Sequence, residues 1–321
     1  MIVEVFLTVA SFFLSLFLLK WWEKTTKKKG IFGIDVHKPF KPIVTEGGGT
    51  VILLVFSLMM LIYGVWLTFQ NNLDARLIVI LCTTLLAGLL GLLDHLVGIR
   101  WRDKILLPFI AALPLVIARV GHTTVNVPFF GMIEFGYLYT LVMIPLAVVG
   151  VINMVNMLAG YNGLEAGFGI INLFWLFVAS LYIQDNLMVF VCLIALSSLL
   201  AFLKFNWYPA KIFPGDVGTF TWGAILVSVA IAGNMERFTV GLFSLYALNF
   251  FLFVFWQIIK APFKKFADVD KDGYLKPPNP YTVYWILPYY FKLKEKTTVE
   301  ILLLVQFLIG LLSFLILIYR W

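Results

Sequence analysis

The chain has 321 residues, of which 62% are hydrophobic and only 13% are charged. Soluble domains are typically about half apolar and about a quarter charged, so this composition excludes a water-soluble protein and indicates residence in a membrane. A net charge of +7 could indicate binding to nucleic acid. The basic residues are placed in alternate loops, however, so they indicate membrane topology instead. We therefore expect no nucleic acid among the partners.

Ten apolar runs are candidates to cross the bilayer, since a helix needs about 20 mostly apolar residues to span the hydrocarbon core. They lie at Ile2–Trp22, Thr50–Phe69, Leu77–Leu93, Ile105–Val120, Tyr137–Met154, Ala166–Ile183, Leu187–Lys204, Thr219–Gly233, Phe238–Ile259 and Val299–Tyr319. The first run precedes its basic cluster, Lys24–Lys29, whereas a cleaved signal peptide has its positive charge first, so we expect a retained span. The predicted fold is an all-α, polytopic bundle of about ten transmembrane helices, formed by residues 1–321 as a single domain.

The basic residues divide the connecting segments into two sets. Segments 20–49, 94–104, 155–165, 204–218 and 260–298 hold 20 of the 24 Lys and Arg residues, and the alternate segments hold only four. Loops rich in Lys and Arg stay in the cytoplasm. We therefore expect both termini outside and five loops facing the cytoplasm. The longest outer segment, residues 121–136, contains Pro128, Gly131 and Gly136 and is predicted to form a small hairpin-like cap.

Two predicted spans have a carboxylate at one end, Asp94 and Asp216. A carboxylate in this position costs desolvation energy unless it is paired or bound to a metal ion. Magnesium in proteins typically takes one or two carboxylates together with the phosphate of a substrate. Glycines at 47–49 and at Gly215 allow close approach of the backbone to an anion, and lysines in the same loops neutralise phosphate. The pattern indicates magnesium-assisted chemistry on a phosphorylated substrate at the membrane surface.

Each of these features also has a purely structural interpretation. Taken alone, Asp94 could be a charged helix end that pairs with Arg100 or Arg102, and the glycines could form a flexible loop. The lysines alone could serve only to keep their loops in the cytoplasm. The segment Asp268–Gly273 matches the start of an EF-hand calcium loop, but the twelfth position is Asn279 where Glu is required, so we expect a solvated turn. The occurrence of such features in all five loops of one face favours a functional site.

Three motifs carry a family resemblance. The longest is the run Asn156–Gly167, which reads NMLAGYNGLEAG; the others are Arg100–Lys104, which reads RWRDK, and Asn206–Asp216, in which NWYP is followed by FPGD. With these motifs the chain resembles the polyprenyl-phosphate N-acetylhexosamine-1-phosphate transferase superfamily, and most closely its eukaryotic and archaeal branch, the dolichyl-phosphate N-acetylglucosamine-phosphotransferases. The resemblance extends from about Asp35 to the tenth span and implies a ten-helix catalytic domain with a cytoplasmic site.

The resemblance implies roles for the residues that would hold the donor substrate. Asn156 and Asp216 would ligate Mg²⁺, the expected cofactor, together with the pyrophosphate of a UDP-sugar. Gly160, Asn162 and Phe213 would form the uridine site, where the ring of Phe213 would stack on uracil.

Other implied roles fall in the first and fifth inner loops. Lys264 and Lys265 match a basic stretch that would contact the pyrophosphate or the sugar, although Phe263 replaces one basic position of that stretch. Glu46 and Lys38 would take part in substrate binding by helping to close the first loop.

The implied catalytic residues are Asp94, Lys104 and Asp216. Lys104 would help to hold the phosphate of the lipid acceptor, and Asp94 would act as a base or orient the acceptor. The family has a pair of Asp residues where this chain has Asp94 and His95, so a role for two carboxylates is not expected here.

The implied reaction transfers N-acetylglucosamine 1-phosphate from UDP-GlcNAc to dolichyl phosphate or another polyprenyl phosphate, with release of UMP. This would be the first step of lipid-linked oligosaccharide synthesis for N-glycosylation. The enzyme would contact membrane lipid in the plasma membrane of an archaeon or the endoplasmic reticulum of a eukaryote, and a homodimer is a further expectation. The alternative is a transporter or flippase for nucleotide sugars or lipid-linked intermediates, which would need polar residues near the bilayer midplane.

Overall fold

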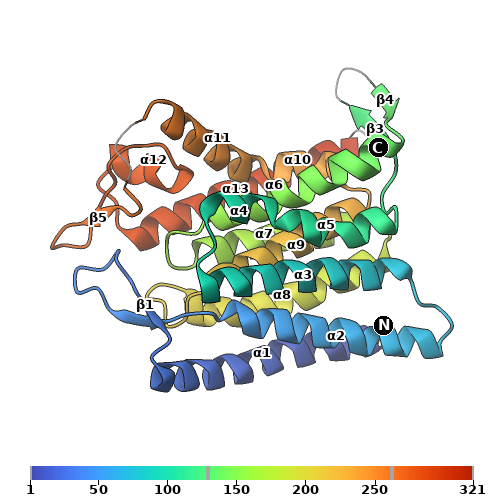
Figure 1. Cartoon of the computed structure of the whole chain (residues 1–321), viewed down its shortest axis with the longest axis horizontal. Coiled ribbons are helices and arrows are strands. Elements are labelled where there is room, and N and C mark those ends of the chain that lie inside the picture. The colour runs from blue at the N-terminus through green and yellow to red at the C-terminus, as the bar shows by residue number, and fades with distance from the viewer. Residues whose placement is uncertain (1, 128–130, 261–263, 320–321) are drawn as a thin grey trace.

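A computed structural model describes residues 2–127, 131–260 and 264–319. Most of this chain is helical, and the long helices lie alongside one another in a single bundle (Figure 1). The described chain begins and ends at the same end of the bundle. The short strands β1 (Phe32–Ile34) and β5 (Asp268–Val269) and the helix α12 (Val283–Tyr290) lie at the opposite end (Figure 1).

Eight helices of the described chain are long and apolar enough to cross a membrane. They are α1 (Ile2–Lys29), α2 (Gly49–Phe69), α3 (Ala75–Val97), the π-helical turn η1 (Tyr139–Met143) continued by α6 (Ile144–Met157), α7 (Leu164–Tyr182), α8 (Asn186–Asn206), α9 (Gly215–Ala232) and α13 (Glu295–Tyr319). Helices α10 (Glu236–Leu242) and α11 (Ser244–Ile258) form a ninth span if they are taken together, with a bend of 59° between them. The all-α polytopic bundle predicted from the sequence is confirmed.

The fourth predicted span, Ile105–Val120, differs from the prediction. The structure has two short helices there, α4 (Trp101–Leu106) and α5 (Pro108–Ile117), and α5 has only ten residues. At about 1.5 Å per residue, α5 covers roughly half of a hydrocarbon core about 30 Å thick. Pro108 explains the break, because proline lacks the N–H that would continue α4 but suits the first turn of a new helix.

The strands form three small antiparallel pairs. β1 pairs with β2 (Ile43–Thr45) in the first loop, and β5 pairs with β6 (Leu275–Lys276) in the fifth. β3 (Thr124–Val127) pairs with β4 (Gly131–Glu134), which confirms the hairpin-like cap, although Pro128 lies outside the described residues.

The segment that resembles a calcium loop is the turn between β5 and β6. Oδ1 of Asp270 accepts the backbone N–H groups of Asp272, at 3.0 Å, and Tyr274, at 2.9 Å. The carboxylate thus closes the turn of a hairpin, as the predicted solvated turn requires.

Helix α9 forms the centre of the bundle, and every residue from Val217 to Ala232 is buried. Two glycines on neighbouring helices let the backbones approach it closely. A Cβ atom on Gly91 of α3 would lie 2.6 Å from the carbonyl oxygen of Asp216, and one on Gly49 of α2 would collide with the backbone of Gly218. The contact at Gly91 brings the C-terminal part of α3 against the first turn of α9, and the contact at Gly49 brings the start of α2 against the same turn.

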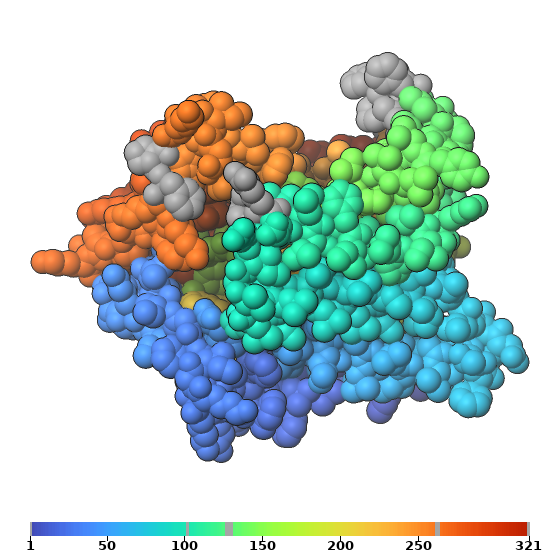
Figure 2. Space-filling model, in the orientation of Figure 1, coloured from blue at the N-terminus to red at the C-terminus, as the bar shows by residue number. Residues whose placement is uncertain are grey.

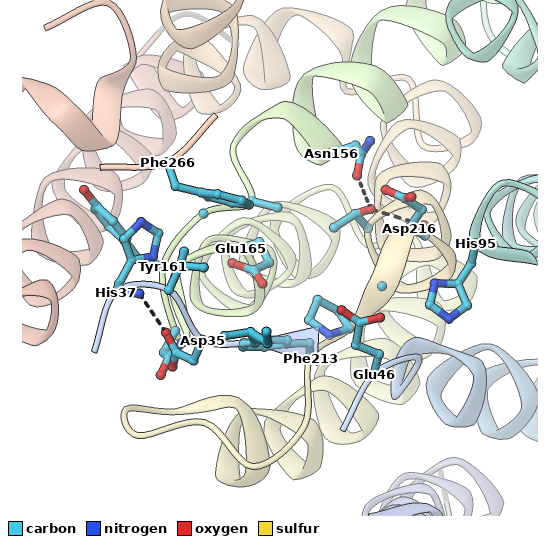
Figure 3. A pocket seen from close by; sticks show the side chains of 18 residues that line it. Asp35, His37, Glu46, His95, Asn156, Tyr161, Glu165, Phe213, Asp216 and Phe266 are labelled. Carbon is cyan, nitrogen blue, oxygen red and sulfur yellow. Dashed lines mark hydrogen bonds between the residues drawn. The ribbon is translucent and has the colours of Figure 1, made fainter. Parts of the chain in front are cut away.

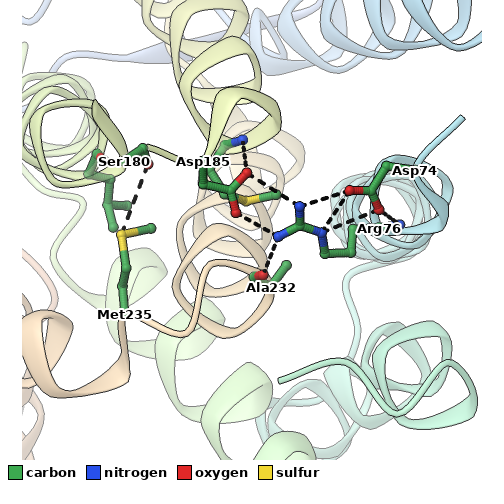
Figure 4. A network of polar contacts seen from close by, with 8 residues as sticks. Asp74, Arg76, Ser180, Asp185, Ala232 and Met235 are labelled. Atoms are coloured by element: carbon green, nitrogen blue, oxygen red, sulfur yellow. Dashed lines mark hydrogen bonds and ion pairs between the residues drawn. The ribbon is translucent and has the colours of Figure 1, made fainter. Parts of the chain in front are cut away.

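At the other end of the bundle, the side chain of Arg76 connects three helices. Its guanidinium pairs with Asp74 at 2.8 Å and with Asp185 at 2.6 Å, and it donates to the carbonyl oxygen of Ala232 at 3.0 Å (Figure 4). Asp74 caps the start of α3, Asp185 caps the start of α8, and Ala232 ends α9. The network therefore fixes the ends of these helices far from the loops that carry the sequence motifs.

Candidate active site

The loops at one end of the bundle enclose a cavity of about 290 Å³. In Figure 2 the surface is hollowed where the first loop, α4 and the segment after α11 meet. All five loops predicted to share one face contribute to the cavity wall. The lining includes Asp35, His37, Glu46, His95, Asn156, Gly160, Tyr161, Asn162, Glu165, Phe213, Asp216, Thr219 and Phe266 (Figure 3).

Two carboxylates and a lysine meet where α3 ends and α9 begins. The Nζ atom of Lys104 pairs with Asp94 and lies 3.0 Å from Oδ1 of Asp216. Asp94 is buried, and its Oδ1 accepts the N–H of Ile99 at 3.0 Å, whereas the side chain of Asp216 is 31% exposed. The structure thus brings the three predicted catalytic residues together, with Asp216 the more accessible carboxylate.

Asn156 lines the same end of the cavity as Asp216. Its Oδ1 accepts a hydrogen bond from the hydroxyl of Thr219 at 2.8 Å, and the same hydroxyl lies 3.2 Å from the carbonyl oxygen of Asp216. The donor set is one carboxylate, one amide oxygen and one hydroxyl. Hard oxygen ligands of this kind fit Mg²⁺, provided that substrate phosphates and water complete its coordination.

The other end of the cavity is aromatic. The ring of His37 stands edge-on to Tyr161, with 4.8 Å between ring centroids, and to Phe266, with 5.8 Å. Phe213 and Phe266 lie on opposite sides of the cavity in Figure 3. Burial lowers the pKa of His37 to about 4, against the opposing effect of Asp35, and Lys38 lowers it further. His37 is therefore neutral near pH 7, and this end offers flat, uncharged ring faces on which a nucleobase can stack.

Lys38 is buried behind this aromatic end and does not itself line the cavity. Only 2% of its side chain is exposed, and its ammonium pairs with Asp35 at 2.8 Å and with Glu295, and donates to Oδ1 of Asn162 at 2.9 Å. These partners belong to the first loop, the start of α13 and the third loop. Lys38 thus ties the first loop to the third loop and to the start of α13. Its part in substrate binding through closure of the first loop stays a prediction.

Glu46 and Gly160 line the cavity, and their part in substrate binding stays a prediction. The carbonyl oxygen of Glu46 accepts the indole N–H of Trp22 at 2.9 Å, which ties the end of β2 to α1. A Cβ atom on Gly160 would lie 3.0 Å from the ring of Tyr284, so the glycine lets the third loop run close to α12.

Lys264 and Lys265 are exposed and lie outside the cavity. Lys264 pairs with Asp268, and the Nζ atom of Lys265 lies 5.2 Å from the ring centroid of Phe266. Phe263 lies outside the described residues. The contact of these lysines with a pyrophosphate stays a prediction, and the residue of this segment that does face the cavity is Phe266.

Several cavity residues were not singled out from the sequence. Thr219 and Glu165 lie beside predicted site residues, and Glu165 is buried with Oε2 unbonded among the described residues. The available signal was their position at the loop ends of apolar spans. Glu295 does not line the cavity but contacts the cavity residue Asn162, and it gave no such signal because it stands in a charged stretch 133 residues further along the chain.

A second cavity adjoins the first and is largely apolar. It has a volume of about 880 Å³ and lies between α6 and α11, where its lining includes Lys104, Leu146, Val149, Met154, Asn156, Phe250, Phe251, Val254 and Ile258. Phe251 is 65% exposed and Ile258 is 71% exposed on the outer surface of the bundle, so this groove opens to the side. Asn156 lines both cavities, which places one end of the groove beside the carboxylates.

Comparison with known proteins identifies the family. The chain matches glycosyl transferase family 4 over residues 77–234. It is 36% identical over 274 residues, 83% of this chain and 81% of the relative, to a Saccharolobus solfataricus protein provisionally named UDP-N-acetylglucosamine–dolichyl-phosphate N-acetylglucosaminephosphotransferase. The chain belongs to the polyprenyl-phosphate N-acetylhexosamine-1-phosphate transferase superfamily.

Other members of this transferase superfamily show the range of its substrates. The chain is 31% identical over 268 residues, 78% of this chain and 82% of the relative, to the phospho-N-acetylmuramoyl-pentapeptide-transferase of Dictyoglomus turgidum. It is 27% identical over 323 residues, 85% of this chain and 72% of the relative, to the UDP-N-acetylglucosamine–dolichyl-phosphate N-acetylglucosaminephosphotransferase of Schizosaccharomyces pombe. The protein is thus an integral membrane transferase, and its polar cavity and apolar groove are the candidate substrate sites.

Proposed function

We propose that this transferase moves N-acetylglucosamine 1-phosphate from UDP-GlcNAc to dolichyl phosphate, or another polyprenyl phosphate, and releases UMP. The observation that carries the proposal is that Asn156 lines both the polar cavity and the apolar groove. A nucleotide sugar in the first and a lipid phosphate at the end of the second would meet beside Asp94, Lys104 and Asp216. The names of the archaeal and fission-yeast relatives support this choice of donor and acceptor.

The proposed step is a phosphoryl transfer. An oxygen of the lipid phosphate attacks the β-phosphorus of the UDP-sugar and forms a new P–O bond. The bond from the β-phosphorus to the bridging oxygen breaks, and UMP leaves with that electron pair. Catalysis of this kind depends mainly on positioning and on electrostatic stabilisation of the transferred group.

Lys104 is the residue best placed to receive the acceptor. Its ammonium has three N–H donors, of which two face Asp94 and Asp216, so one remains for a phosphate oxygen. A phosphate monoester is already largely ionised near neutral pH, because its second pKa is about 6. Asp94 therefore serves to orient Lys104, and no proton has to be removed from the acceptor.

Asp216 and Asn156 would hold the magnesium ion that this function requires. The ion would neutralise charge on the pyrophosphate while the β-phosphorus is transferred. The exposed carboxylate of Asp216 and the amide oxygen of Asn156 are suitable ligands, and their sparse number agrees with a metal that binds together with substrate phosphate.

The charge distribution supports a proposal for orientation. The cavity end of the bundle contains the loops that hold 20 of the 24 basic residues, so we place it in the cytoplasm and both termini outside. The membrane is the plasma membrane in an archaeon or the endoplasmic reticulum in a eukaryote, and residues 1–321 act as one catalytic domain. The homodimer stays a prediction.

A reconstituted assay tests the reaction. Purified protein with Mg²⁺ and dolichyl phosphate should convert radiolabelled UDP-GlcNAc to lipid-linked product and UMP in equal amounts. UDP-N-acetylmuramoyl-pentapeptide is the matched control donor, because a relative of similar identity is named for that chemistry. Turnover of the control donor alone would refute the proposed specificity. Passage of UDP-GlcNAc across a proteoliposome membrane without lipid product would favour the transporter alternative.

A further inference from the structure

Asn249 lies on the buried side of α11 and connects this helix to two others. Only 1% of the residue is exposed, and both groups of its amide have a partner. Nδ2 donates to the carbonyl oxygen of Met157 at 3.2 Å, and Oδ1 accepts the backbone N–H of Val283 at 2.9 Å. A carbonyl oxygen can only accept and a backbone N–H can only donate, so these two partners determine which way the amide faces.

Both partners of Asn249 stand at helix ends. Met157 is the last residue of α6, and Val283 is the first residue of α12. The last carbonyl groups and the first N–H groups of a helix have no partner within that helix. Within the described residues, the N-cap of α12, Thr282, makes no capping hydrogen bond with its side chain. Asn249 therefore caps α6 and α12 from a third helix, and this requires a side chain that carries both a donor and an acceptor.

The two capped helices hold the third loop. Asn156 directly precedes Met157 in the last turn of α6, and it lines both the polar cavity and the apolar groove. In the first turn of α12, the ring of Tyr284 packs so closely on the third loop that a Cβ atom on Gly160 would lie 3.0 Å from it. Asn249 links both contacts to α11, which forms one wall of the groove, although Asn249 itself lines neither cavity.

We propose that Asn249 is a positioning residue that fixes Asn156 with respect to α11, so that the metal ligand and the acceptor groove keep one spacing. The proposal rests on the proposed function for the placement of Mg²⁺ at Asn156 and of the lipid phosphate at the end of the groove. Without the cap, the end of α6 can shift relative to α11, and Asn156 shifts with it. Mg²⁺ demands near-ideal octahedral geometry, and a misplacement of about 1 Å can reduce a rate by about 100-fold.

The test is calorimetric titration of the full chain and its variants with UDP, in Mg²⁺ and in chelator. The ratio of the two affinities is the magnesium enhancement of UDP binding. Asn249→Asp keeps an oxygen for the N–H of Val283 but sets a second oxygen against the carbonyl of Met157. It should lower the magnesium enhancement at least about tenfold and leave the affinity in chelator unchanged. Asn249→Leu is nearly isosteric and removes both bonds, so it should lower the enhancement equally and reduce turnover at least about tenfold.

Asn172→Leu is the matched control, because it removes another fully buried amide from the bundle. Oδ1 of Asn172 accepts from Gln306, and neither residue lines the polar cavity or the groove. The control should lower Tm about as much as Asn249→Leu does but keep the wild-type magnesium enhancement. If Asn249→Leu does not fold, Asn249→Asp still decides.

Three results would overturn the proposal: a wild type without magnesium enhancement, an Asn249→Asp variant that keeps the wild-type enhancement, or an Asn172→Leu control that loses it. Because no lipid acceptor is present in the titration, failure of the proposed function is distinguishable. A wild type whose enhancement depends on Asn249 but which forms no lipid-linked sugar would refute the reaction and leave the positioning of Asn156 standing.

Discussion

The variant Gly91→Ala tests whether the contact of α3 with α9 positions the reacting groups. A Cβ atom there would lie 2.6 Å from the carbonyl oxygen of Asp216 and 2.7 Å from Cα of Val217, whereas ordinary contacts begin at 3.4 Å. Both neighbours are backbone atoms, so the two helices must separate by roughly 0.8 Å in a tightly packed interior. Asp94 is three residues further along α3 and would move away from Lys104 and Asp216 with its helix.

This displacement should affect turnover much more than stability. Overpacking typically destabilises a protein by about 1–3 kcal/mol, while replacing glycine by alanine within a helix stabilises it by about 1 kcal/mol. A shift of about 1 Å in a catalytic group can reduce the rate by about 100-fold. We therefore expect a small fall in Tm and a loss of roughly two orders of magnitude in turnover with both substrates saturating.

The assay is the rate of lipid-linked product formation, measured beside Tm in the same detergent. Gly64→Ala on α2 is the matched control, because the nearest atom to its Cβ would be Cδ2 of Leu77 at 3.3 Å, the movable end of a side chain. The control should keep both turnover and Tm. Gly91→Ala with wild-type turnover would show that the close contact does not position Asp94.

Asp94→Asn should reduce turnover by about 100-fold or more but leave UDP-GlcNAc affinity nearly unchanged in calorimetry, because Asp94 faces Lys104; an active variant would remove Asp94 from the mechanism. Asp216→Ala should abolish turnover and the magnesium dependence of UDP-GlcNAc binding, since metal and substrate share this ligand; equal wild-type affinity in magnesium and in chelator would contradict the shared site. Single cysteines at Lys28 and Arg237 should react from opposite sides of the membrane, Lys28 from the cytoplasm, and reaction of both from one side would refute the topology. The pKa of His37 is lowered from 6.5 to about 4. Between these two pKa values the unfolded chain binds a proton at His37 that the folded protein does not bind. The contribution of His37 to the free energy of unfolding is therefore complete above pH 6.5 and falls as the pH approaches 4, by up to roughly 3 kcal/mol. His37→Gln should therefore show a shallower fall in Tm between pH 6.5 and 4.5 than the wild type, and equal slopes would exclude His37 as the cause.

The sequence predicted the bundle because hydrocarbon imposes a simple rule of length and polarity on every span. The rule failed at residues 105–120, where Pro108 divides an apolar run into two short helices. It also gave no sign of α12, since eight residues in a loop are too few to show periodicity. The bend of 59° between α10 and α11 lies within the predicted span Phe238–Ile259, where the sequence carries no proline to indicate a break.

The lining of the cavity was predictable where a motif keeps its residues in one loop, as Asn156, Gly160 and Asn162 show. It was less predictable where function depends on burial. The sequence places Lys38 in a basic loop, but it cannot show that its ammonium is enclosed by two carboxylates and an amide. Glu295 could not be found at all, because its role arises from a contact between the third loop and the start of the last helix, which only the folded chain creates.

The sideways opening of the groove between α6 and α11 has a consequence for kinetics. A polyprenyl phosphate that enters there arrives by diffusion within the bilayer, whereas the nucleotide sugar arrives from water. The rate should thus follow the mole fraction of acceptor among the surrounding lipids, and added inert phospholipid should slow the reaction although the amount of acceptor in the vessel is unchanged. Diluting the whole suspension with buffer containing the same UDP-GlcNAc concentration should leave the rate per enzyme unaltered. The rate should therefore depend on the surface density of the lipid acceptor in the membrane and on the volume concentration of the nucleotide sugar in water.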